Sequence, residues 1–343
     1  MNFASDNTSG ASPEIMDAMV RANEGQYMSY GADAYTSRVR ERICEVFEVD
    51  ADVYLVATGT AANALSLSVL MSNYGAALCH WESHVYEDEC GAPEFFSGGG
   101  KLIPIEGQNG KMDPELISHY AARGVGDVHM SQPQAVSVTQ ETETGSVYSI
   151  TELEAISQIC KSNQLKLHMD GARFANALVS LECSPAEMTW KAGVDALSFG
   201  ASKNGAMACE AVVLFDRSLS QEFEFRRKRA GHLFSKMRLL ASQMEAYLEA
   251  DLWLKNARHA NQMAKRLHNG LSRIEGIEMS ANVDANILFP KFPAALTQDL
   301  NSQGIEFYSD RWEEGIVRLV TAFDTPQNHV DGFLAAVQKH MST

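Results

Sequence analysis

The sequence predicts an α/β fold: a large domain with a mostly parallel central sheet flanked by helices, followed by a small C-terminal α+β domain. Two observations support this prediction. The middle of the chain alternates short apolar runs of strand length with amphipathic stretches of helical length, as parallel strands joined by helical crossovers require. The 343 residues also suffice for one large core and a smaller one. We place the large domain at residues 1–250 and the small domain at 251–343.

Several apolar runs in the large domain have the length and composition of buried strands. These expected strands are 53–57, 136–139, 165–169 and 196–199. A further strand is expected at 210–216. It follows the strand at 196–199 too closely for a helical crossover, so we expect it to run antiparallel.

The helices are predicted from periodicity and from their start signals. Ser149 and Glu152 have the spacing of a capping box, which predicts a helix from there to about Lys161. Other helices are expected at 61–71 and, separated by a break, at about 218–248 and 251–272. The small domain then shows short strands and helices at 286–289, 294–302, 316–320 and 327–340.

Composition excludes several classes of partner and compartment. The net charge of −16 argues against nucleic acid or an anionic membrane surface as a partner. The six cysteines form no CxxC pair and are expected to be reduced thiols, and we assign no metal ligands. The first residues lack the pattern of a secretion signal, and no apolar run reaches the ~18 residues of a membrane span. We therefore expect a soluble, cytoplasmic enzyme.

The most informative side chains follow two of the predicted strands. Asp170 ends the run Leu167-His168-Met169-Asp170, and Lys203 lies in the small-residue stretch Gly200-Ala201-Ser202-Lys203-Asn204-Gly205. A lysine amine can hold the aldehyde of pyridoxal 5'-phosphate (PLP) as an imine, and a carboxylate can keep the ring nitrogen of this cofactor protonated. Either residue alone is more often a surface lysine or a helix-capping aspartate. Together they predict a PLP enzyme in which Lys203 and Asp170 are catalytic.

Two further segments fit the same cofactor. Gly59 and Thr60 lie at a strand-to-helix turn, where free N–H groups and the helix dipole favour a phosphate, although an ordinary capped helix has the same pattern. His84 can stack on a pyridine ring, and Asp88, four residues on, would share its helix face and raise its pKa. An exposed, acidic helix start is the alternative interpretation of the His84 segment.

Basic residues are scarce, which makes two of their positions informative. Arg318 lies on an apolar strand of the small domain, where a buried guanidinium needs a partner. That partner is either an internal carboxylate or the carboxylate of an amino-acid substrate. The run Arg226-Arg227-Lys228-Arg229 is usually a solvated helix face, and contact with a phosphate in a neighbouring subunit is the alternative.

Taken together, these segments resemble the low-specificity L-threonine aldolases, and most closely the Pseudomonas-type threonine and phenylserine aldolases. The resemblance runs nearly end to end in one consistent order. Its matching segments are Ser5-Asp6, Tyr30-Gly31, Gly59-Thr60, Ser83-His84-Val85, Glu89-Cys90-Gly91-Ala92-Pro93-Glu94-Phe95-Phe96-Ser97, His168-Met169-Asp170-Gly171-Ala172-Arg173-Phe174, Lys203-Asn204-Gly205 and Arg318-Leu319-Val320-Thr321.

The resemblance implies a fold-type I PLP enzyme that forms a homotetramer from tight dimers. It implies the following cofactor contacts: Lys203 as the imine lysine, Asp170 at the ring nitrogen, His84 on the ring, Gly59 and Thr60 at the phosphate, and Arg173 near the ring oxygen. It implies a second set around the amino-acid substrate: Ser5, Arg173 and Arg318 at the carboxylate, with Tyr30 at the pocket across the dimer interface.

One segment departs from the family pattern. Many relatives carry an Asn-Thr-His segment after the strand that ends near Val138, and the histidine lies in the pocket. This chain has Gln140-Glu141-Thr142-Glu143 there and no histidine. His129 and Asp88 are the residues we consider as replacements, and the catalytic base is therefore left open, with His84 assisted by Asp88 as the first choice.

The predicted reaction is retro-aldol cleavage of L-threonine, L-allo-threonine and related L-β-hydroxy-α-amino acids, including phenylserine, to glycine and an aldehyde, and its reverse. The cofactor residues fit equally an aminotransferase or a β-eliminating lyase. A non-catalytic PLP-binding regulator is disfavoured by the acidic charge and by the lack of a DNA-binding module. An NAD-type oxidoreductase is disfavoured by the missing G-x-G-x-x-G fingerprint.

Overall fold

The computed structural model describes residues 1–280 and 283–342. Within them, seven strands form one central sheet in the order β1-β7-β6-β5-β4-β2-β3. Their bounds are β1 Asp52–Val56, β2 Gly75–His80, β3 Lys101–Ile105, β4 Gln132–Thr139, β5 Lys166–Gly171, β6 Ala196–Gly200 and β7 Glu210–Leu214. β7 runs antiparallel to both of its neighbours, and every other pair in the sheet is parallel. The predicted α/β class and the antiparallel strand after β6 are confirmed.

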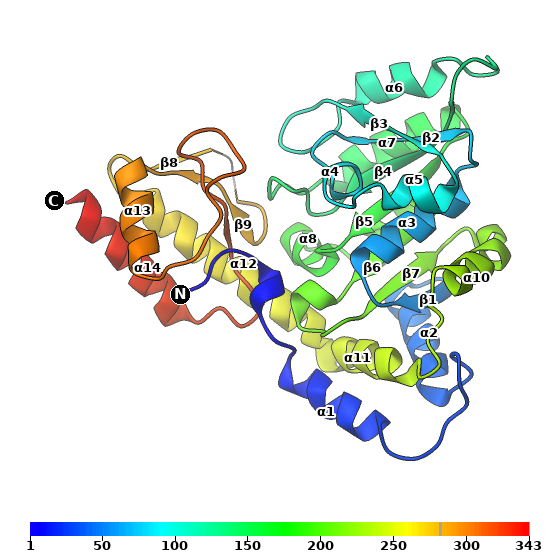
Figure 1. Ribbon diagram of the computed structural model, residues 1–343, viewed down its shortest axis with the longest axis horizontal. Helices are drawn as coiled ribbons and strands as arrows, with labels where there is room; N and C mark the ends of the chain where they lie inside the picture. The colour runs from blue at the N-terminus through cyan, green and yellow to red at the C-terminus, as the bar shows by residue number, and fades with distance from the viewer. Residues whose placement is uncertain (281–282, 343) are drawn as a thin grey trace.

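Helices cover both faces of the sheet, and the C-terminal helices lie in the small domain (Figure 1). Their bounds are α1 Pro13–Ala22, α2 Ala34–Phe47, α3 Gly59–Leu70, α4 His84–Glu87, α5 Ala92–Ser97, α6 Pro114–Ala122, α7 Ile150–Ser162, α8 Phe174–Leu181, α9 Pro185–Met188, α10 Ser220–Arg229, α11 Arg238–Leu248, α12 Leu252–Leu271, α13 Ala294–Ser302 and α14 Gln327–Met341. Alternate residues of a strand point to opposite faces of the sheet and are buried there, which explains why helices cover both faces. In β1, Val53 and Leu55 join the core under α2, whereas Tyr54 and Val56 join the core under α3.

Two sequence predictions are corrected here and one is confirmed. β2 and β3 were missed, because β2 is alanine-rich and β3 is an edge strand that carries Pro104. The predicted helix at 218–248 is two helices, α10 and α11. Gly231 has φ +80° just after α10, a conformation that ends helices. The capping box at Ser149 is confirmed, since its hydroxyl accepts the Glu152 N–H while the Glu152 carboxylate accepts the Ser149 N–H.

A second hydrophobic core fills the small domain. Short antiparallel pairs, β8 Glu278–Met279 with β10 Pro290–Lys291 and β9 Ile287–Leu288 with β11 Leu319–Val320, pack there against α12, α13 and α14. The residue boundary we expected at 250 falls just before α12. That helix contributes Trp253 and Ala257 to the large core and Leu267 and Leu271 to the small one.

The N-terminal segment crosses between the two cores. Phe3 packs in the small-domain core and donates its N–H to Glu306 O, so the chain starts on the small domain before α1 joins the large one (Figure 1). Residues 5–8 then pass over the carboxyl ends of the sheet strands. This path brings Asp6 to Arg173, which directly follows β5. Among the described residues, no helix is long and apolar enough to span a membrane.

Candidate active site

One cavity of about 490 Å³ lies at the carboxyl ends of the parallel strands. Ligands of open α/β sheets bind at this edge because the strands end there and their connecting loops converge. Most of the residues we predicted for the site line it. They are Ser5, Gly59, Thr60, His84, Asp88, Asp170, Arg173, Lys203 and Arg318. Lys203 and Asp170, on which the prediction depended most, therefore face a single cavity.

Lys203 lies in a short 3₁₀ turn after β6, half-buried in the cavity wall. Its pKa is lowered, first by burial and then by the nearby Arg173 guanidinium. In the described residues its amine makes no hydrogen bond or ion pair, so it is available to a ligand. The small residues before it have a packing reason, because a Cβ at Gly200 would lie 2.5 Å from Ala172 O.

Asp170 is held in place from two sides. One carboxylate oxygen accepts the Ala172 N–H at 3.0 Å, and the other accepts Asn63 Nδ2 at 2.8 Å. Asn63 lies on α3 and also donates to Glu89 Oε1 at 2.9 Å. A single amide thus fixes two buried carboxyls of the site, and sequence reasoning did not identify it.

The partner of the His84 imidazole is Glu89 and not Asp88, which corrects our prediction. His84 Nδ1 lies 2.9 Å from Glu89 Oε1, and the hydrogen bond to this carboxylate raises the pKa of His84. The predicted shared helix face fails because α4 ends at Glu87, so Asp88 turns outward and binds Arg311 at 3.0 Å. Asp88 still lines the cavity, but through an ion pair that does not include His84.

The turn before α3 fits a phosphate. Thr58 Oγ1 accepts the Ala61 N–H at 3.1 Å, so the hydroxyl caps the helix and the N–H groups of Gly59 and Thr60 are left for a ligand. The space beside Gly59 is open, since a Cβ there would meet no atom within 4 Å. This cradle, the free Lys203 amine and the fixed Asp170 carboxylate fit the three polar ends of PLP.

The similarity of this chain to known proteins agrees with this geometry. The beta-eliminating lyase family model matches residues 2–292. A low-specificity L-threonine aldolase from Pseudomonas sp. is 43% identical over 99% of this chain and 98% of its own, and one from Pseudomonas aeruginosa is 44% identical over 94% and 93%. A structure of Leishmania major threonine aldolase superposes with a TM-score of 0.93 at 29% identity, covering 99% of both chains.

The chain belongs to the low-specificity L-threonine aldolase family. Its sheet order and its cavity at the strand ends are those of a fold-type I enzyme. The family resemblance was visible in the sequence, but the contacts between the family's residues were not.

The two arginines of this aldolase-family pocket differ in their partners. Arg173 Nε and Nη2 donate to the two oxygens of buried Asp6 at 2.7 and 2.9 Å. Burial alone would raise the pKa of Asp6, but Arg173 more than offsets it and lowers that pKa. Arg318 instead donates from Nη2 to Ala4 O at 3.2 Å, and its buried Nε has no partner among the described residues.

Ser5 lies at the cavity, whereas Tyr30 lies away from it. Ser5 lines the cavity, and its hydroxyl accepts the Asn7 N–H at 3.1 Å as the cap of a 3₁₀ turn. Tyr30 is half exposed and does not line the cavity of its own chain. Its ring lies 4.6 Å from Lys228 Nζ, within the basic run 226–229, so any contact of Tyr30 with a pocket requires another subunit.

The segment that lacks the family's histidine supplies carboxyls to the cavity. Glu141 and Glu143 both line it, and neither was among our predicted site residues. His129, considered as a replacement, is exposed in the loop before β4, at the opposite edge of the sheet from the cavity. Spacing could have indicated the two glutamates, because residues two apart on an extended loop face the same side.

Proposed function

We propose that this protein is a PLP-dependent aldehyde-lyase that cleaves L-β-hydroxy-α-amino acids to glycine and an aldehyde and catalyses the reverse addition. L-threonine, L-allo-threonine and phenylserine are the substrates we expect. The observation that carries the proposal is the single cavity that brings together a free amine on Lys203, a fixed carboxylate on Asp170 and the guanidinium of Arg318, whose Nε has no hydrogen-bond partner among the described residues. These groups match the cofactor and the carboxylate of an amino acid.

The residues that would hold PLP are Lys203 at its aldehyde, Asp170 at its ring nitrogen, His84 on its ring and the turn at Gly59 and Thr60 at its phosphate. When bound, PLP supplies an electron sink for the pair released from the Cα–Cβ bond. Asp170 keeps the ring nitrogen protonated, and Asn63 keeps Asp170 in position for this task.

The substrate carboxylate is oriented by Arg318. Its guanidinium lies against the rings of Tyr308 and Trp312, at 5.1 and 5.5 Å from their centroids, so its plane is fixed, and no carboxylate of the described residues forms an ion pair with it. A planar fork of this kind suits a carboxylate. Arg173 contributes positive charge and the N–H groups that Asp6 leaves free. Holding the carboxylate in one place sets which bond at Cα is aligned for cleavage.

Assembly and compartment also belong to this proposal. Large apolar side chains are exposed on the single chain, among them Met28, Met207 and Phe95, and packing against another subunit would bury such side chains. We propose a homotetramer in the cytoplasm. Light scattering on the purified protein tests the assembly.

The test of function uses the purified protein loaded with PLP. We expect glycine and the matching aldehyde in equal amounts from threonine, allo-threonine and phenylserine. The Lys203→Ala variant should lose both this activity and the visible absorbance of the bound cofactor, whereas Asp170→Ala should retain PLP and barely turn over. Keto-acid formation with an amino acceptor would indicate an aminotransferase instead, and ammonia release from serine a β-eliminating lyase.

A further inference from the structure

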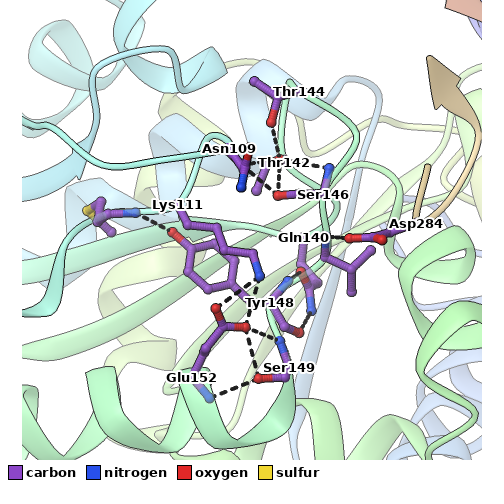
Figure 2. A network of polar contacts seen from close by, with 12 residues as sticks. Asn109, Lys111, Gln140, Thr142, Thr144, Ser146, Tyr148, Ser149, Glu152 and Asp284 are labelled. Carbon is purple, nitrogen blue, oxygen red and sulfur yellow. Dashed lines mark hydrogen bonds and ion pairs between the residues drawn. The ribbon is translucent and has the colours of Figure 1, made fainter. Parts of the chain in front are cut away.

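The loop between β4 and α7 carries two carboxyls into the cavity while its other side chains hold it in place. Glu141 and Glu143 line the cavity. Gln140 turns the other way, and its amide bonds to the backbone N–H and C=O of Tyr148 at 2.9 and 2.8 Å (Figure 2). Thr142 also turns away. Alternate residues of this loop thus serve two purposes, the cavity and the scaffold.

The scaffold side is densely bonded. Thr142 Oγ1 lies within hydrogen-bond distance of Ser146 Oγ, at 2.9 Å, and of Asn109 O, at 3.2 Å, and Ser146 Oγ donates to the same Asn109 carbonyl at 2.6 Å (Figure 2). The Tyr148 hydroxyl accepts the Met112 N–H at 2.8 Å. A loop anchored to two neighbouring segments can hold a carboxyl in one position, which acid–base catalysis requires.

Glu143 lies beside the imidazole that we expect on the cofactor ring. Its Oε1 accepts the backbone N–H of His84 at 2.8 Å, so this oxygen holds the side chain in position. Besides this N–H, only the backbone N–H of Glu143 itself acts on the carboxyl as a hydrogen-bond donor among the described residues, and the side chain lines the cavity. A carboxyl that is anchored by backbone groups at a cavity wall has the geometry of a general base.

The charges around Glu143 give it a suitable affinity for a proton. Burial, followed by the nearby Asp170 carboxylate, raises the pKa of Glu143 to about 7, while the His84 N–H and imidazole oppose that rise. The other titratable groups that sense it are Cys79, Tyr148 and Arg173. A base with a pKa close to the working pH both accepts and releases a proton readily.

The other titratable groups of the cavity are less suited to this task. His84 has its Nδ1 committed to Glu89, and the raised pKa favours its protonated form. Asp88 is paired with Arg311. Glu141 is 1% exposed, its pKa is raised to about 8, and it lies on the side of Arg173 and Asp6. One carboxylate oxygen of Glu210 already accepts the Ala201 N–H.

We propose that Glu143 is the general base that takes the proton from the β-hydroxyl of the substrate. This inference rests on the proposed aldolase function. The hydroxyl O–H bond breaks and its proton moves to the Glu143 carboxylate. The electron pair of that bond becomes the second bond of the aldehyde C=O, and the Cα–Cβ pair passes to the bound cofactor. In the reverse addition Glu143 returns the proton to the new hydroxyl.

The decisive variant is Glu143→Gln in the PLP-loaded enzyme. The glutamine carbonyl can still accept the His84 N–H, so position is kept while basicity is lost. We expect threonine cleavage to slow by ~10²–10⁴-fold, and the acidic limb of the kcat/KM profile near pH 7 to disappear. Glycine binding by calorimetry and the visible spectrum of the cofactor should be unchanged, because glycine has no β-hydroxyl.

A matched control and a second readout separate this role from a structural one. Glu87→Gln removes an exposed carboxyl from the same short helix as His84 and should leave cleavage unchanged. Formate should partly restore cleavage in Glu143→Ala. Full activity in Glu143→Gln, or loss of its glycine binding, would overturn this assignment alone. A wild-type holoenzyme that cleaves none of the β-hydroxy amino acids would overturn the proposed function as well.

Discussion

Arg173 and Arg318 both line the same cavity, but their hydrogen-bond partners differ. Arg173 is paired with a carboxylate, whereas Arg318 is not paired with one among the described residues. Arg173 forms a two-point ion pair with Asp6, and both side chains are almost fully buried, at 10% and 2% exposure. Arg318 has aromatic rings against its face and an unpartnered Nε at its edge. A buried guanidinium without a carboxylate is costly. The difference therefore indicates that Arg173 holds the structure together and that Arg318 is kept open for a ligand.

The largest effect should follow from breaking the ion pair between Arg173 and Asp6. Arg173→Met leaves Asp6 buried without its partner, so the free energy of unfolding should fall by about 3–5 kcal/mol, as for other broken buried pairs. Chemical denaturation measures this. The double variant Asp6→Asn with Arg173→Met should recover part of the loss, since no lone charge is then buried. A single-variant loss below about 1 kcal/mol would mean that Arg173 does not stabilise the fold.

Replacement of Arg318 should have the opposite effects, raising KM while leaving the free energy of unfolding almost unchanged. Arg318→Met removes the donors we expect at the substrate carboxylate, and charged hydrogen bonds of this kind contribute about 1.5–3 kcal/mol, so KM for threonine should rise roughly 10- to 150-fold. Unfolding free energy should change little, because no buried carboxylate loses its partner. Steady-state kinetics and denaturation of the same sample check both. An unchanged KM with a large loss of stability would make the two arginines equivalent.

The smallest effect concerns Glu141, the second carboxyl near Arg173. Both of its oxygens are buried without a hydrogen-bond partner, and burial raises its pKa from 4.5 to about 8. The protonated form is therefore favoured in the folded state. This contribution to stability is complete below about pH 4.5 and is lost as the pH rises through 8.

Glu141→Gln removes this titration while it keeps the shape of the side chain. The melting temperature of the variant, relative to the wild type, should rise between about pH 5 and pH 9. Thermal unfolding of both proteins across this range provides the comparison. A difference that stays flat with pH would show that the pKa of Glu141 is not raised in the folded state.

Much of the cofactor side of the site could be predicted because it follows strand ends. Asp170 lies at the end of β5 and Lys203 lies in the short turn that follows β6, and parallel strands end at one edge of a sheet. The partner of His84 could not be predicted, because it depends on where α4 stops. A helix one turn longer would have placed Asp88 beside the imidazole, but the helix ends at Glu87 and Glu89 turns inward.

The sequence by itself determined the class of fold, the positions of Lys203 and Asp170 at strand ends, and the family. These features depend on the local periodicity of apolar residues and on residue type. The tertiary structure alone decided which charges are neutralised. Asp6 meets Arg173 across 167 residues, and Asn63 meets Asp170 across 107. Electrostatic interactions depend on distance in space and on exclusion of water, and neither quantity is local in sequence. The unpartnered Nε of Arg318 and the place of Glu143 at the cavity wall are therefore properties of the folded chain.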